Sequence, residues 1–73
     1  MTRTFILEDL DCAHCAQKIQ DAVAKIDGVS ECKVTFLTQK MVYNVEDSKN
    51  DAAEKEMRKI VKNTEPDVTV KAV

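Results

Sequence analysis

The apolar residues of this chain alternate with polar residues in some segments and recur at every third or fourth position in others. Alternation is typical of a strand with one buried face, and the longer spacing is typical of a helix with one apolar face. Alternation occupies residues 2–8, 29–37, 41–45 and 67–73. The helical spacing occupies residues 13–26 and a second segment, with Ala53, Met57 and Val61, that ends before Pro66. The predicted order is therefore strand, helix, strand, strand, helix, strand.

Both predicted helices are flanked by residues that favour helix ends. Gly28 follows the first helix, and glycine accepts the left-handed conformation that closes many helices. Pro66 ends the second helix. The candidate N-caps of the second helix are Ser48, Asn50 and Asp51. The pattern predicts an α+β domain of the ferredoxin-like βαββαβ type, in which a four-stranded antiparallel sheet carries both helices on one face.

Length and composition exclude several classes of protein. The chain has 73 residues, 44% apolar and 33% charged, which predicts one globular domain over residues 1–73. Its net charge is −2 with acids and bases interspersed, so nucleic-acid binding is not expected. No apolar run approaches the roughly 18 residues that span a bilayer. We therefore expect neither a signal peptide nor direct membrane insertion of this segment.

The sequence "LDCAHCA" at residues 10–16 holds two of the three cysteines and the only histidine. The pattern places Cys12 in the loop after the first strand and Cys15 in the first helical turn. Two intervening residues allow both sulfurs to reach one ion at about 2.3 Å. The positive end of a helix favours a thiolate, which prepares a cysteine for metal binding or for oxidation. A metal site and a thiol-disulfide pair both fit these residues.

A structural zinc site needs four protein ligands, and the chain has no second pair of cysteine or histidine residues. The predicted site is therefore open, which suits an ion that is handed on. His14 precedes Cys15 by one helical position, a rotation of about 100°, so we expect a surface or supporting role rather than direct ligation. Cys32 shares a strand face with Val34 and is expected to fill the core. An odd number of cysteines without a disulfide framework favours a reducing compartment, the cytoplasm.

The segments "LDCAHCAQKI" and "GVSECKVTF", together with the element order over the whole chain, resemble the heavy-metal-associated domain of metallochaperones and heavy-metal P-type ATPases. The resemblance implies that Cys12 and Cys15 bind the metal. The usual motif of this family has Gly-Met, one variable residue and then the first cysteine. Here Asp9 and Leu10 occupy these positions, so the apolar residue is kept and the glycine is replaced.

Asp11 is the residue that indicates the metal. Two thiolates complete the coordination of copper(I), whereas zinc, cadmium and lead carry twice the charge and accept a carboxylate in addition to the thiolates. The zinc, cadmium and lead branch of the family resembles this chain in having aspartate before the first cysteine. Copper members often have Gly-Tyr or Gly-Phe where Glu65 and Pro66 stand here. Glu65 is a candidate oxygen donor, although a surface charge is the simpler interpretation.

We therefore expect a binding module, not an enzyme, that holds one zinc, cadmium or lead ion through Cys12, Cys15 and Asp11, with His14 and Glu65 as further candidates. The resemblance implies transfer by ligand exchange to the transport core of a heavy-metal ATPase, to which the domain belongs or which it serves from the cytosolic face of a membrane. The domain is expected to be a monomer, with a metal-bridged dimer as the alternative.

Three other hypotheses remain open at this point. The nearest is a copper(I) chaperone or copper ATPase domain. The second is a thiol-disulfide redox module, for which CxxC at a helix start is also typical. The third is a ferredoxin-like domain with no ligand, because a fold does not fix a function.

Overall fold

The centre of the sheet consists of β1 (Thr2–Glu8) and β3 (Lys40–Val45), with β2 (Val29–Thr35) and β4 (Thr69–Ala72) at the edges. The computed structural model describes all of residues 1–73. The strand order is β2-β3-β1-β4, and every neighbouring pair is antiparallel. The predicted sheet is thus confirmed.

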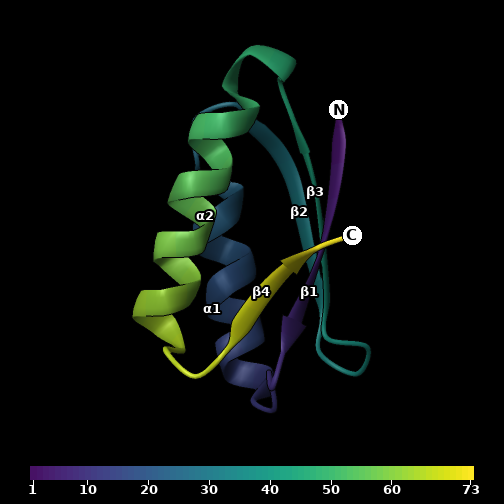
Figure 1. Cartoon of the computed structure of the whole chain (residues 1–73), viewed down its shortest axis with the longest axis vertical. Helices are drawn as coiled ribbons and strands as arrows, with labels where there is room; N and C mark the ends of the chain where they lie inside the picture. The colour runs from purple at the N-terminus through teal and green to yellow at the C-terminus, as the bar shows by residue number, and fades with distance from the viewer.

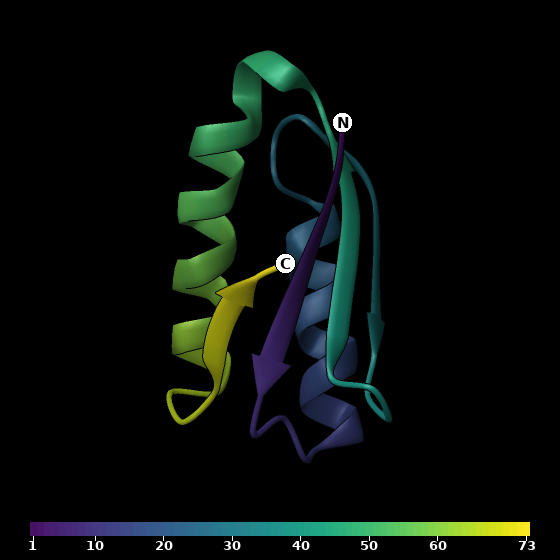
Figure 2. The same ribbon diagram turned by 45° about the vertical axis from the view of Figure 1, so that its right-hand side comes forward.

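The two helices, α1 (Ala13–Ala24) and α2 (Asn50–Thr64), lie side by side on one face of the sheet (Figure 1, Figure 2). A short 3-10 turn, η1 (Asp47–Lys49), leads into α2. This two-layer arrangement confirms the ferredoxin-like fold that the hydrophobic pattern predicts. Neither helix combines the length and the apolar character that crossing a bilayer requires.

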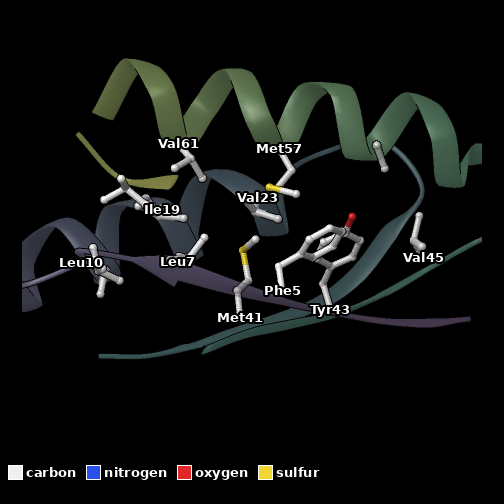
Figure 3. Close-up of a cluster of buried hydrophobic side chains, with 13 residues drawn as sticks. Phe5, Leu7, Leu10, Ile19, Val23, Met41, Tyr43, Val45, Met57 and Val61 are labelled. Carbon is white, nitrogen blue, oxygen red and sulfur yellow. The ribbon is translucent and has the colours of Figure 1, made fainter. Parts of the chain in front are cut away.

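The core lies between the sheet and the helices (Figure 3). Alternate strand residues and every third or fourth helix residue point into it, as the two spacings require. The sheet contributes Phe5, Leu7, Met41, Tyr43 and Val45. The helices contribute Ala16, Ile19, Val23, Ala53, Met57 and Val61, and the loops contribute Leu10 and Val68. Since each is at most 9% exposed, these side chains form one continuous apolar cluster.

The antiparallel registers bring three connections to one end of the molecule. Ile6 pairs with Lys40, so the turn between β2 and β3 lies beside the end of β1. Glu8 pairs with Thr69, so the connection from α2 to β4 lies on the other side of that end. The loop from β1 to α1, which contains Cys12, therefore has neighbours from two distant parts of the chain.

The first helix is shorter than predicted. It ends at Ala24 with Lys25 as its C-cap, although the apolar spacing continues to residue 26. Gly28 has the expected left-handed conformation, with φ of 92°, but it lies in the following turn. A Cβ atom there would lie 2.8 Å from Cβ of Lys49, which is fixed to the backbone and cannot turn aside, so the turn also requires glycine for space.

The three predicted N-caps of α2 are wrong. The N-cap is Lys49, whose side chain makes no capping hydrogen bond. Asn50 instead accepts a hydrogen bond of 2.6 Å from Nη1 of Arg3, whose Nη2 donates to Glu54 at 2.8 Å. Asp51 lies in the first turn, where its negative charge stabilises the helix by attraction to the positive end of the helix dipole. Asn50, one of the predicted caps, therefore connects α2 to β1 through its hydrogen bond with Arg3.

The edge strands are also shorter than their alternation suggested. β2 ends at Thr35, and Phe36 packs against the core from the turn that follows. β4 is flanked by Val68, which is buried, and contains Val70, which is half-buried, but Ala72 is exposed rather than inward. An edge strand has a neighbour on one side only, so its last residues have little to cover them.

Tyr43 combines good packing with an unmet polar requirement. Its ring stacks on Phe5 with centroids 5.7 Å apart and an angle of 14° between the planes (Figure 3). Its hydroxyl is buried and has no hydrogen-bond partner. Burial accordingly raises the pKa of Tyr43. The ring stabilises the core, whereas the hydroxyl costs free energy because it loses water without replacement.

Tyr43→Phe should therefore raise the free energy of unfolding by about 1 kcal/mol, because it removes only the unpaired hydroxyl. Urea denaturation of both proteins measures this difference. Tyr43→Leu is the control, since it removes the stacked ring as well and should destabilise the protein. A clear loss of stability in Tyr43→Phe would show that the hydroxyl has a partner in solution.

Candidate functional site

The backbone between β1 and α1 makes a tight reversal before the first cysteine. Asp9 has a φ of 69°, in the left-handed region where glycine is usual. Leu10 turns inward and is 1% exposed, so it anchors the loop to the core. The observed conformation explains why a motif with glycine at the position of Asp9 suits this loop. Aspartate is among the few other residues that tolerate it.

Cys12 is the N-cap of α1, with extended backbone angles. Its Sγ accepts a hydrogen bond of 3.3 Å from the backbone N–H of Cys15, and its carbonyl accepts one of 3.0 Å from the N–H of Ala16. No acidic residue occupies the first turn of α1, so the positive end of the helix is free to favour a thiolate at Cys12. The predicted placement of both cysteines is confirmed.

Glu65 brings a carboxylate to the second cysteine. It is the C-cap of α2, where its N–H donates to the carbonyl of Val61 at 2.8 Å. The Sγ of Cys15 donates to Oε1 of Glu65 at 3.5 Å, across 50 positions of sequence. This residue is half-buried rather than a free surface charge. The site therefore contains a thiol-carboxylate contact between α1 and the end of α2.

The surroundings shift the pKa values of the two thiols in opposite directions. The side-chain and backbone hydrogen bonds from Cys15 lower the pKa of Cys12. The pKa of Cys15 is raised to about 12 by its hydrogen bond with Cys12, by desolvation and by its hydrogen bond with Glu65. These contacts therefore favour the ionised form of Cys12 and the protonated form of Cys15.

The side chains of the other two predicted site residues make no hydrogen bond or ion pair with the cysteines or with Glu65. Asp11 and His14 are both exposed. No group of three or more histidine, cysteine, aspartate or glutamate side chains is close enough to hold an ion in this conformation. The cysteine pair and Glu65 are thus placed by the fold, whereas ligation by Asp11 stays a prediction that requires its side chain to turn.

One contact to the loop was missed by sequence reasoning. Nε2 of Gln39, in the turn between β2 and β3, donates to the carbonyl of Leu10 at 3.0 Å. A polar residue in a polar turn carries no signal of such a contact. Cys32, in contrast, behaves as expected: it packs against the core, and burial raises its pKa to about 11.

The sequence matches the family model described as "Heavy-metal-associated domain" over residues 4–70. It is 31% identical over 67 residues to a cadmium, zinc and cobalt-transporting ATPase of Bacillus subtilis, covering 92% of this chain and 10% of the ATPase. It is 32% identical to the copper chaperone CopZ of Enterococcus hirae, covering 74% of this chain and 78% of the chaperone. A mercuric transport protein periplasmic component of Pseudomonas fluorescens is 33% identical, covering 88% of this chain and 65% of that protein.

Solved structures agree on the fold. The N-terminal domain of the zinc(II) ATPase ZiaA superimposes with a TM-score of 0.79 at 19% identity, covering 100% of this chain and 97% of that domain. The chain spans about a tenth of the length of the first ATPase that it matches. The relatives carry copper, mercury and zinc or cadmium in their names, so they identify a metal-binding module without selecting its metal.

Iodoacetamide at neutral pH should modify Cys12 first, because alkylation requires the thiolate and only the pKa of Cys12 is lowered. We expect Cys12 to react at least about tenfold faster than Cys15 or Cys32, since one pKa unit changes the thiolate fraction tenfold. The rate at Cys12 should rise with pH and level off below the pH required by the other two thiols. Peptide mass spectrometry measures each site. The same reaction in urea is the control, in which the preference should vanish, and faster labelling of Cys15 in the folded protein would contradict the assignment.

Proposed function

The chain belongs to the heavy-metal-associated domain family, and from this premise we propose that it binds one zinc, cadmium or lead ion through Cys12, Cys15 and Asp11. The domain is a metal-binding module, and no catalytic step is assigned to it. The observation that carries the proposal is the cysteine pair at the start of α1 with the carboxylate of Glu65 3.5 Å from the Sγ of Cys15.

Carboxylates on both sides of the thiol pair support a divalent ion. Asp11 precedes Cys12 in the loop, and Glu65 contacts Cys15 from the end of α2. Zinc, cadmium and lead accept mixed sulfur and oxygen ligands, whereas copper(I) gains little from oxygen once it has two thiolates. The exposed Asp11 has freedom to turn toward the sulfurs, so it completes a site that the fold leaves partly built.

Metal binding in this arrangement releases protons. The lowered pKa of Cys12 favours its thiolate, and Cys15 must lose the proton that it donates to Glu65 before its sulfur can bind an ion. As pH falls, protons compete with the metal for both sulfurs. Metal affinity should therefore weaken toward acidic pH.

The proposed site is suited to transfer as well as binding. Cys12 and Cys15 are only half-buried, at an end of the molecule made of loops, so a ligand from a partner can reach the ion before the first sulfurs leave. We propose that the partner is the transport core of a heavy-metal ATPase or another delivery protein. The ATPase relative supports this partner, and the domain would then act in the cytoplasm or at the cytosolic face of a membrane.

A remaining coordination position has four candidate donors: water, Glu65, the exposed His14 or a residue of a second copy. The last of these would make a metal-bridged dimer. We propose the monomer, in which Glu65 or water fills the position, because the carboxylate already lies beside Cys15.

Copper(I) is the second candidate cargo. The observation that favours it is the similarity to the copper chaperone CopZ, which this chain covers over 78% of its length. The thiol pair alone would satisfy copper(I), so the two candidates differ in what they require of Asp11 and Glu65.

Zinc titration of the reduced protein should show one site that Cys12→Ala abolishes, because one thiol cannot hold the ion against buffer. Cys32→Ala is the matched control, since it also removes one sulfur but leaves the site intact, and it should bind zinc as the parent does. Competition with a chelator of known affinity gives the dissociation constants. Absence of zinc binding by the parent, or equal binding by parent and Cys12→Ala, would refute the proposed site.

Asp11→Ala separates the divalent proposal from the copper candidate. It should weaken zinc binding about tenfold or more and change copper(I) binding by less than about twofold, because only the divalent ion uses the oxygen. Asp67→Ala is the control: it removes the same charge from an exposed position in the loop after Glu65. Small, equal effects of Asp11→Ala on both metals would overturn the assignment of Asp11.

A further inference from the structure

Gln39 connects two parts of the molecule that are far apart in sequence. It lies in the turn between β2 and β3, and Nε2 of its side chain donates to the carbonyl of Leu10 at 3.0 Å. Its own carbonyl accepts a hydrogen bond of 2.7 Å from the N–H of Leu7, at the end of β1. One residue thus holds the chain on both sides of the reversal at Asp9.

We propose that Gln39 is a positioning residue for the metal loop, the segment Asp9–Cys12. The inference rests on the proposed function, because it gives the held conformation a purpose: the loop places Cys12 against the start of α1. Gln39 does not touch the sulfurs. It acts on them through Leu10, two residues before Cys12.

The hydrogen bonds of the metal loop single out this contact. The N–H of Leu10 donates to the carbonyl of Leu7 at 3.3 Å, and the carbonyl and Sγ of Cys12 accept bonds from the first turn of α1. All of these bonds join neighbours in sequence. The bond from Gln39, across 29 positions, is the only hydrogen bond to the metal loop from a distant part of the chain.

The backbone of Gln39 supports a specific role for its side chain. Its φ is 57°, in the left-handed region that disfavours residues with a Cβ. Glycine or asparagine would adopt this conformation at lower cost. Glycine has no side chain, and asparagine is one methylene shorter, so neither reproduces the contact of Gln39 with Leu10. The strained backbone is thus kept together with a side chain that makes the long-range contact.

The loss of this bond should loosen the metal loop with little effect on the rest of the fold. Gln39 is half-buried and is not one of the core residues, and Leu37 in the same turn is 89% exposed, so the Gln39 side chain adds little to the core. Leu10 remains buried in either case. A looser loop spends less time with Cys12 in its capping position, which should weaken metal binding and expose the amides that the cap protects.

Two variants remove the bond in different ways. Gln39→Glu keeps the size of the side chain but replaces the donor by a carboxylate, which repels the carbonyl of Leu10. Its added negative charge alone would strengthen the binding of a cation. Gln39→Gly removes the side chain and relieves the backbone. Gln20→Ala is the matched control, because the amide oxygen of Gln20 also bonds to the backbone, at the N–H of Val34, away from the metal loop.

The first measurement is amide hydrogen exchange at Cys15 and Ala16 in the metal-free protein. The N–H groups of these two residues donate to Cys12. Exchange should rise about three- to tenfold in both Gln39 variants and stay near the parent value in Gln20→Ala. Urea denaturation checks that global stability does not account for the change. Unchanged exchange in the Gln39 variants, or an equal rise in the control, would overturn the inference whether or not the protein binds zinc.

The second measurement is the zinc dissociation constant, which should rise about three- to tenfold in both Gln39 variants. Tighter binding by Gln39→Glu would show that charge prevails over positioning, and it would overturn the role of Gln39 while leaving the proposed function intact. Failure of the parent to bind zinc would refute the proposed function instead. The exchange measurement would then still decide whether Gln39 holds the loop.

Discussion

The antiparallel pairing of β1 with β3 is the interaction on which the rest of the structure depends. It places Phe5 opposite Met41 and sets Phe5 and Tyr43 in stacking contact on the face that the helices cover. A shift of one residue would turn Phe5 and Leu7 to the open face and remove the sheet side of the core. The same register fixes the turn that holds Gln39 beside the end of β1. The pairing of β1 with β3 therefore determines both the composition of the core and the contact that holds the metal loop.

The fold could be predicted because its two hydrophobic periods are clear where burial is complete. The alternation at Met41, Tyr43 and Val45 follows a central strand, and all three side chains are buried. The prediction fails where burial fades. Ala72 on β4 is exposed although it continues the alternation. Asn50 appeared to be a helix cap, but its side chain is engaged by Arg3, a partner 47 positions away that local pattern cannot reveal.

The candidate site divides in the same way. Cys12 and Cys15 could be placed from local signals, because both lie at the start of one helix and their geometry is set within four residues. Glu65 and Gln39 could not be placed so firmly, since their contacts cross 50 and 29 positions and depend on where the strands pair. A glutamate after a helix and a glutamine in a turn look like ordinary surface residues in sequence. Tertiary contacts alone give them a place at the site.

The fold makes two chemically identical thiols unequal, and under the proposed function this inequality gives the site an order of events. Hydrogen bonds from Cys15 favour the ionised form of Cys12, so its sulfur would be the first available to an arriving ion. Cys15 would bind after giving up to water the proton that it donates to Glu65. Return of a proton to Cys15 would weaken its bond to the ion, which would then be open to a ligand from a partner. The asymmetry therefore favours transfer over permanent retention.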